Sequence, residues 1–181
     1  MGYWNTRGLR GSAFEEIINF TNDRYKSMGL AVVQKIPTPI TPVQFDSGKK
    51  IITLAYFDKQ STVDYIGIAQ GHGLCFDAKE TNQKSLPIQN IHSHQIEFMM
   101  KFSQQGGVAF LLVHMAEYGK YYFLPIEILE KYWTKSVSGG RKSIPISAFE
   151  DIYEVKIRGG GIIDYLEAVN TYLCEREKTE S

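Results

Sequence analysis

Two aspartates and one lysine form the pattern in this sequence that is best suited to chemistry. Asp77 and Lys79 lie two residues apart in a segment, residues 74–80, whose composition predicts a β-strand. Side chains two apart on a strand point to the same face, so these two residues should lie together. A glycine-containing turn would return residues 62–69 against this strand and bring Asp64 to the same place.

The chemistry that Asp64, Asp77 and Lys79 suit is phosphodiester hydrolysis. Two converging carboxylates repel each other unless a cation neutralises them, and Mg²⁺ favours such oxygen ligands while it keeps water and substrate phosphate oxygens in its shell. A neighbouring lysine can stabilise the charge that develops on a phosphorane, or orient the attacking water. An acid followed by D-x-K also fits an exposed strand of alternating polarity, and both interpretations stay open at this point.

A polar residue on the apolar stripe of the next predicted helix is a further candidate. This helix should begin at Pro87 and end at Gly106 and Gly107. The residues at helical spacing on its inner face are Ile88, Ile91, Gln95, Met99 and Phe102. Gln95 therefore lies on the buried side, where its amide needs a polar partner to offset desolvation. A metal site would supply one, and so would an ordinary hydrogen bond to the backbone.

The elements that would position these residues alternate between helix and strand. The first helix should begin at Ser12, which has capping-box spacing to Glu15, and end at Gly29. Prolines at positions 37, 39 and 42 predict an irregular excursion, because proline cannot sit in a central ladder. Strands are expected at residues 30–36, 51–57, 62–69, 74–80, 108–115 and 121–124, helices at 126–135 and 163–174, and a second capping box at Ser147–Glu150. The pattern predicts one α/β domain over residues 1–181.

Composition and charge exclude some classes of protein. The 181 residues are 43% hydrophobic, enough for a core, and no apolar stretch approaches the roughly 20 residues that cross a bilayer. We see no charged leader and only two cysteines, so we expect a soluble cytoplasmic protein without a disulfide framework. The 20 basic and 20 acidic residues give no net charge that would point to nucleic acid. Three basic clusters can still form a positive surface, or be solvated loops: Arg7 and Arg10, Lys49 and Lys50, Arg141 and Lys142.

Five sequence blocks resemble those of the RecU-like Holliday-junction resolvases, a family of PD-(D/E)XK nucleases. The central blocks are TVDY from Thr62, FDAKET from Phe76 and QNIHSHQIE from Gln89, and the flanking blocks are PTP from Pro37 and GRKSI from Gly140. They follow the family's order and cover nearly the whole chain. The resemblance implies a mixed central sheet flanked by helices, the αβββαβ core of these nucleases, with a projecting stalk.

The resemblance also implies roles for the site residues. The ligands of Mg²⁺, or of Mn²⁺ in its place, would be Thr62, Asp64, Asp77 and Gln95. Lys79 would stabilise the transition state. The family more often carries glutamate where this chain has Asp77, which remains an oxygen donor of the same charge. Related nucleases often place another carboxylate on the first helix, here Glu15, although a capping box is the explanation we prefer for that residue.

A homodimer that acts on four-way DNA junctions is a further implication of the resemblance. The insertion at about residues 37–60 would be the stalk that enters the junction, and a two-fold dimer would nick two opposing strands symmetrically. A recombinase is a further candidate partner. The residues expected to contact DNA are Arg7, Arg10, Lys35, Lys49, Lys50, Lys59, Arg141 and Lys142.

Three other hypotheses stay open. The chain can be a PD-(D/E)XK nuclease with another DNA target, such as linear duplex or branched repair intermediates. It can be a junction-binding or recombinase-modulating protein in which Asp77 is a step toward an inactive site. Lastly, it can be an unrelated α/β protein with a chance D-x-K, but the other blocks would then be coincidence.

Overall fold

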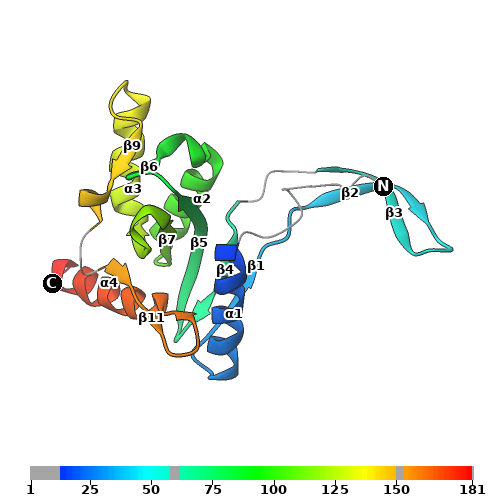
Figure 1. Cartoon of the computed structure of the whole chain (residues 1–181), viewed down its shortest axis with the longest axis horizontal. Coiled ribbons are helices and arrows are strands. Elements are labelled where there is room, and N and C mark those ends of the chain that lie inside the picture. The colour runs from blue at the N-terminus through cyan, green and yellow to red at the C-terminus, as the bar shows by residue number, and fades with distance from the viewer. Residues whose placement is uncertain (1–12, 58–61, 150–152, 181) are drawn as a thin grey trace.

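A six-stranded mixed sheet lies at the centre of the computed structural model, which describes residues 13–57, 62–149 and 153–180 (Figure 1). The strand order is β1-β4-β5-β7-β8-β10. Only β5 and β7 pair in parallel, and the other neighbours in this sheet are antiparallel. The strands are β1 (Ala31–Lys35), β4 (Tyr65–Ala69), β5 (His72–Thr81), β7 (Val108–Met115), β8 (Lys120–Pro125) and β10 (Glu154–Val155).

Helices cover both faces of this sheet. The buried side chains form two hydrophobic cores. One contains residues of α1 (Ala13–Ser27) and α4 (Tyr165–Glu180). The other contains residues of α2 (Ser93–Gln104) and α3 (Ile126–Val137). The expected α/β fold, a mixed central sheet flanked by helices, is therefore confirmed. In the described part of the chain, no helix combines the length and apolar character needed to span a membrane.

The alternation of side chains along β5 decides which face carries the candidate site. Leu74 and Phe76 belong to the core under α1 and α4, whereas Cys75 belongs to the core under α2 and α3. Because side chains alternate along a strand, Asp77 and Lys79 follow Cys75 onto the α2 face. The parallel β5–β7 pair requires a crossover connection, and α2 lies in that connection.

Short elements complete the body. β6 (Ser85–Pro87) pairs with β9 (Ser143–Pro145), and β11 (Ile157–Arg158) pairs with β12 (Ile162–Ile163). The 3₁₀ turns that the described residues complete are η1 (Ile88–Asn90), η2 (Ala116–Tyr118) and η3 (Ile146–Ala148). The β6–β9 pair joins two segments about 60 residues apart in sequence, because Leu86 is the partner of Ile144.

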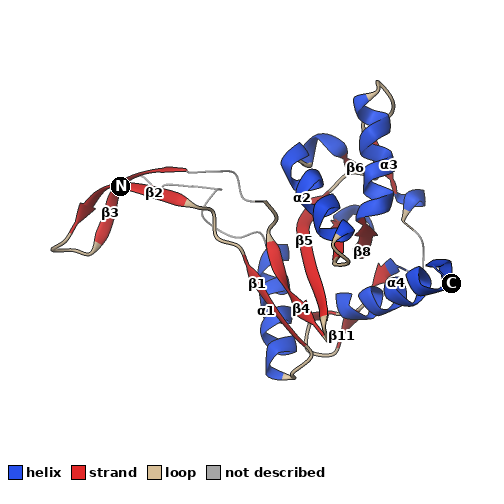
Figure 2. Ribbon diagram, turned by 180° about the vertical axis from the view of Figure 1, so that it is seen from behind, coloured by secondary structure: helices blue, strands red, loops and turns tan. Residues whose placement is uncertain are grey.

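The excursion predicted as irregular is a regular hairpin. β2 (Ile40–Asp46) and β3 (Ile51–Phe57) form a two-stranded sheet that projects away from the body (Figures 1 and 2). We call this hairpin, residues 40–57, the stalk. Pro42 lies inside β2, next to a register shift between Pro42 and Gln44. Proline is tolerated here because neither strand is central and the bulge absorbs the missing donor.

The start of the second helix was predicted wrongly. α2 begins at Ser93 rather than at Pro87, because Pro87 is the last residue of β6 and both Ile91 and His92 have extended backbone. The inward positions are unaffected by the shift. Ile88 and Gln95 are both buried, as the helical spacing predicted.

Two other boundaries also differ. Within the described residues, Ser147 does not begin an α-helix as a capping box would predict. It belongs to η3. Phe149 is extended and its ring contacts that of Tyr122. α4 runs to Glu180, and Ile163 belongs to β12 instead. The Ser12 capping box lies outside the described residues.

Candidate active site

Asp64 and Asp77 face each other one step beyond the last β4–β5 pair, Tyr65 with Phe76. The backbone N–H of Asp64 donates to Asp77 Oδ1 at 3.0 Å, and the backbone N–H of Ala78 donates to Asp64 Oδ2 at 3.0 Å. Asp64 thus precedes the strand that was expected to contain it. The two carboxylates accept hydrogen bonds that strand carbonyls would otherwise accept, and this ends the ladder at the site.

The charge of Asp77 makes Asp64 harder to ionise. Burial and the charge of Asp77 raise the pKa of Asp64 to about 6, although the Ala78 N–H and the Lys79 ammonium act in the opposite direction. Asp77 is completely buried. Repulsion between two carboxylates in such a place is relieved by a cation bound between them, so the electrostatics of the pair suit metal binding.

Lys79 and Gln95 both contact the buried Asp77. Lys79 Nζ lies 2.6 Å from Asp77 Oδ2, and Gln95 Nε2 donates to the same oxygen at 2.9 Å. Gln95 Oε1 accepts from the backbone N–H of His92 at 3.1 Å and from Lys79 Nζ at 3.5 Å. The juxtaposition expected from the D-x-K spacing and the helical stripe is therefore present. The partner that the buried amide needed is mainly a carboxylate rather than the backbone alone.

The available donors suit a hard divalent ion with an incomplete protein shell. Among the described residues, no three His, Cys, Asp or Glu side chains are arranged to hold a metal ion. An ion between Asp64 and Asp77 would therefore take its other ligands from neutral oxygens, water and phosphate, as Mg²⁺ commonly does. Gln95 Oε1 is one such oxygen. Thr62 is exposed two residues before Asp64, and its role as a ligand stays a prediction.

Glu15, the additional acid suggested by the resemblance, forms an ion pair outside the Asp64–Asp77 contacts. Its Oε2 is 2.7 Å from the Nζ of Lys35, the last residue of β1. Lys35 is the register partner of Tyr65, whose hydroxyl donates to the Glu15 carbonyl at 3.4 Å and to Asn19 Oδ1 at 3.1 Å. Lys35 therefore belongs to the central sheet and not to the stalk. A role for Glu15 at the metal stays a prediction.

The expected DNA-binding residues occupy two separate places, apart from Lys35. Lys49 and Lys50 are exposed in the turn at the tip of the stalk, where Asp46 Oδ1 accepts from the backbone N–H groups of Gly48 and Lys49. Lys142 is held beside η1, because its carbonyl accepts from the Ile88 N–H at 3.1 Å. The neighbouring Arg141 is also exposed. Arg7, Arg10 and Lys59 lie outside the described residues.

Two histidines next to Gln95 lie closer together than helix geometry predicted. Residues two apart on a helix point in different directions, so His92 and His94 would diverge if both lay on the helix. Their rings instead stack, with centroids 5.5 Å apart and planes at 10°. The reason is that His92 precedes the helix and has extended backbone. The sequence pattern began this helix too early, at Pro87, and therefore could not indicate that His92 precedes it.

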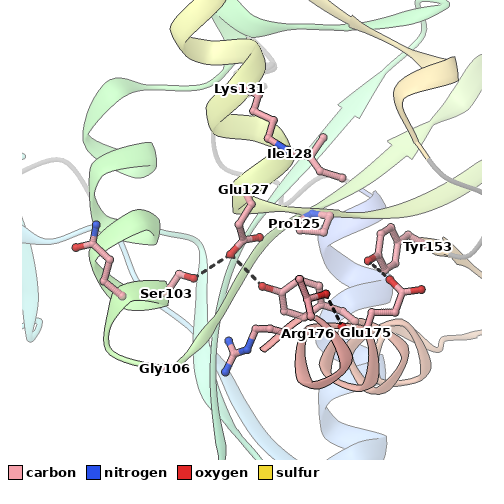
Figure 3. A pocket seen from close by; sticks show the side chains of 12 residues that line it. Ser103, Gly106, Pro125, Glu127, Ile128, Lys131, Tyr153, Glu175 and Arg176 are labelled. Atoms are coloured by element: carbon pink, nitrogen blue, oxygen red, sulfur yellow. Dashed lines mark hydrogen bonds between the residues drawn. The ribbon is translucent and has the colours of Figure 1, made fainter. Parts of the chain in front are cut away.

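A cavity of about 730 Å³ lies at the other end of α2 (Figure 3). Its lining includes Ser103 of α2, Glu127 of α3 and Tyr172 of α4, and Glu127 Oε1 accepts from Ser103 Oγ at 3.0 Å and from the Tyr172 hydroxyl at 2.9 Å. The lining includes none of Asp64, Asp77, Lys79 and Gln95. An α-helix of this length spans roughly 18 Å, so the cavity is separate from the carboxylate site.

Comparisons with known proteins identify relatives along nearly the whole chain. A family model described as Recombination protein U matches residues 9–171. The Holliday junction resolvase RecU of Lactococcus lactis subsp. lactis (strain IL1403) is 45% identical over 173 residues, which cover 93% of this chain and 80% of that protein. The protein of the same name from Latilactobacillus sakei subsp. sakei (strain 23K) is 40% identical over 176 residues, covering 94% and 84%.

A solved structure has a more distant likeness. It is that of Archaeoglobus fulgidus Hjc, described as a Holliday junction resolvase from an archaeal hyperthermophile. The match has a TM-score of 0.46 and 14% sequence identity, and covers 77% of this chain and 91% of the Hjc chain. The family assignment therefore rests on the sequence matches.

Proposed function

Because this chain belongs to the RecU family, we propose that it is a Holliday-junction resolvase, a divalent-metal-dependent endonuclease that cuts four-way DNA junctions during recombination. The observation that carries the proposal is the convergence of Asp64, Asp77, Lys79 and Gln95 within hydrogen-bond distance on one face of the sheet. Phosphodiester hydrolysis needs this combination of paired carboxylates and an adjacent ammonium.

The site residues divide the chemistry between them. Asp64 and Asp77, with the Gln95 amide oxygen and Thr62 as further ligands, would hold Mg²⁺, or Mn²⁺ in its place; the ion supplies Lewis-acid activation and a more acidic bound water. The Lys79 ammonium stabilises the charge that develops on the phosphorane oxygens. Gln95 Nε2 orients the Asp77 carboxylate through its 2.9 Å hydrogen bond. Cleavage leaves a 5′-phosphate and a 3′-hydroxyl.

A homodimer is supported by the apolar surface of the stalk. Ile52, Leu54 and Tyr56 alternate along β3 and so share one face, with 44%, 42% and 64% of each residue exposed. Phe45 lies opposite Ile52 in the β2–β3 register and is 59% exposed. A lone two-stranded hairpin is marginal in water, and contiguous exposed apolar surface marks an interface. The stalk of a second copy, related by a two-fold axis, would cover this face.

Two-fold symmetry also fits the substrate. A four-way junction presents two equivalent strands, and a two-fold dimer offers one active site to each, so the product would be a pair of symmetric nicks. The exposed Lys49 and Lys50 at the stalk tip would meet backbone phosphates near the junction centre. Phosphate contacts of this kind make binding strongly salt-dependent.

The first test is cleavage of a labelled mobile four-way junction in Mg²⁺, beside a linear duplex of the same sequence. We expect symmetric nicks in the junction, loss of these nicks in Asp64→Ala and in EDTA, and little change in Asp23→Ala, which removes an exposed carboxylate from α1. Equal cutting of duplex and junction would identify a nuclease with another target. Tight junction binding without cutting, restored by Asp77→Glu, would identify a non-catalytic descendant of the family.

A further inference from the structure

Lys79 already supplies the positive charge that the buried Asp77 requires. Asp77 is completely buried, and only 16% of the Lys79 side chain is exposed. A buried carboxylate without a cation nearby is costly to ionise. The 2.6 Å contact between Lys79 Nζ and Asp77 Oδ2 neutralises it. The charge of the site is therefore partly balanced from within the chain.

The position of this ammonium conflicts with a metal ion on the same oxygen. A Mg²⁺ ligand oxygen lies at roughly 2.0–2.1 Å from the ion. An ion that close to Asp77 Oδ2 would stand within a few ångströms of a lysine nitrogen that is itself 2.6 Å from that oxygen. Two cations at such a separation, in a place that water enters little, repel each other strongly. The ion pair and a metal on Asp77 Oδ2 are thus alternatives.

A second acceptor for the ammonium lies next to the first. Gln95 Oε1 is 3.5 Å from Lys79 Nζ, and the backbone N–H of His92 holds this oxygen in place at 3.1 Å. The ammonium would lose both acceptors to an ion that binds Asp77 Oδ2 and Gln95 Oε1, the two oxygens it now contacts. It then gains the freedom to approach a phosphate that arrives with the DNA.

We propose that Lys79 is an internal counter-ion that competes with the divalent metal for Asp77, and that metal binding releases its ammonium toward the scissile phosphate. This inference rests on the proposed function, since it takes Asp64 and Asp77 as the metal ligands. Metal loading and the delivery of the transition-state cation then become one event. The metal-free site keeps its lysine engaged and cannot offer it to DNA.

The test is metal affinity in the absence of DNA. Mn²⁺ binding to the full chain is measured by isothermal titration calorimetry, and free Mn²⁺ is counted independently by electron paramagnetic resonance. We expect Lys79→Met to bind Mn²⁺ about tenfold more tightly than wild type, a change of about 1.4 kcal/mol. Lys101→Met is the matched control. It removes the same charge from an exposed ion pair with Glu97 on α2, and should change the affinity less than twofold.

A second measurement protects the test against loss of folding. Without its counter-ion, Asp77 should lower the thermal stability of Lys79→Met in EDTA, and Mn²⁺ should raise its melting temperature more than that of wild type. Lys79→Gln, which keeps a hydrogen-bond donor but not the charge, should behave in the same direction. These shifts need no catalytic turnover.

The outcomes separate the two proposals. Mn²⁺ binding by wild type that is unchanged or weakened in both Lys79 variants would overturn the counter-ion role and leave the metal site intact. Absence of binding in wild type and in both variants would overturn the metal site as well. Tighter binding in Lys101→Met by the same factor would show a general charge effect and would also overturn the counter-ion role.

Discussion

Two antiparallel hairpins follow each other along this chain, the stalk and the β4–β5 hairpin, and they differ in how far their side chains are buried. In the β4–β5 hairpin, Phe76 and Asp77 are completely buried, because helices cover both faces of the sheet. In the stalk, Tyr56 and Phe57 are 64% and 80% exposed (Figure 2). Folding of the chain itself completes the β4–β5 hairpin. The stalk has the apolar content of a core strand, and no layer of the described residues covers it, so we propose that another molecule does.

The largest effect should be a loss of junction cleavage, caused by a change at the β4–β5 hairpin, which we call the buried hairpin. Asp64→Ala removes one of the two proposed metal ligands and should lower junction cleavage at least about a thousandfold. Junction binding, which we propose depends on the stalk and on basic surfaces, should change less than about threefold. Gel-shift and cleavage assays on one labelled junction measure both quantities. Equal losses of binding and cleavage would contradict the separation of roles.

Dimer dissociation should be the main consequence of a charge on the apolar face of the stalk. Leu54→Asp places a carboxylate among Ile52, Tyr56 and Phe45, and should weaken the dimer by about 30-fold or more, because a buried unpaired charge is costly. Sedimentation at several concentrations gives the dissociation constant. Thr53→Asp adds the same charge to the opposite face of β3 and is the control. Equal effects of both variants would contradict a one-sided interface.

The stalk tip should contribute affinity through charge alone. Replacing Lys49 and Lys50 by glutamine should weaken junction binding about tenfold at moderate salt and lower the salt slope by about 2. Lys26→Gln with Lys178→Gln, on α1 and α4, removes the same charge far from the tip. Binding measured across a salt series distinguishes the two pairs. Identical slopes for both double variants would argue against phosphate contacts at the tip.

The buried hairpin should show its charge repulsion as a pH effect on stability. The pKa of Asp64 is raised from 3.8 to about 6, so the folded state binds this proton more tightly than the unfolded state. In EDTA, the free energy of unfolding contributed by this group is highest below about pH 4 and falls as the pH rises through 6. Asp64→Asn removes the repulsion and should stabilise the protein by on the order of 1–2 kcal/mol at pH 8, and by much less at pH 4. Urea titrations of wild type and Asp64→Asn at both pH values measure this stabilisation. The same stabilisation at pH 4 and at pH 8 would contradict charge repulsion as its cause.

The smallest effect is expected at the ion pair between Glu15 of α1 and Lys35 of β1. Glu15→Gln frees the Lys35 ammonium from a partly exposed ion pair, so stability should fall by less than about 1 kcal/mol. Junction affinity should rise about two- to threefold, since one positive charge gains access to phosphate. Fluorescence anisotropy with a labelled junction is sensitive enough for this change. Weaker binding of Glu15→Gln would mean that Glu15 itself serves the substrate site.

The two hairpins also differ in how far the sequence could predict them. The period of two that unites Asp77 with Lys79 and the helical stripe that buries Gln95 are local patterns, and both were predicted. The pairing of β6 with β9 depends on residues about 60 positions apart, and no local pattern contains it. β2 was missed because Pro42 argues against a strand unless the strand is known to be an edge. His92 stacks on His94 because α2 begins only at Ser93, a boundary that the local sequence pattern did not predict.

The place where the stalk leaves the body has a mechanical consequence. Lys35 and Tyr65 are the last paired residues of β1 and β4, and beyond them the Ile36 N–H donates to the Asp64 carbonyl at 2.8 Å. A twisting force applied to the stalk therefore reaches the body first at the peptide of Asp64. The carboxylate of the same residue is tethered to the Ala78 N–H on the far side. Because Asp64 is also a proposed metal ligand, we expect the way a junction sits on the stalk to affect the geometry of the carboxylate pair.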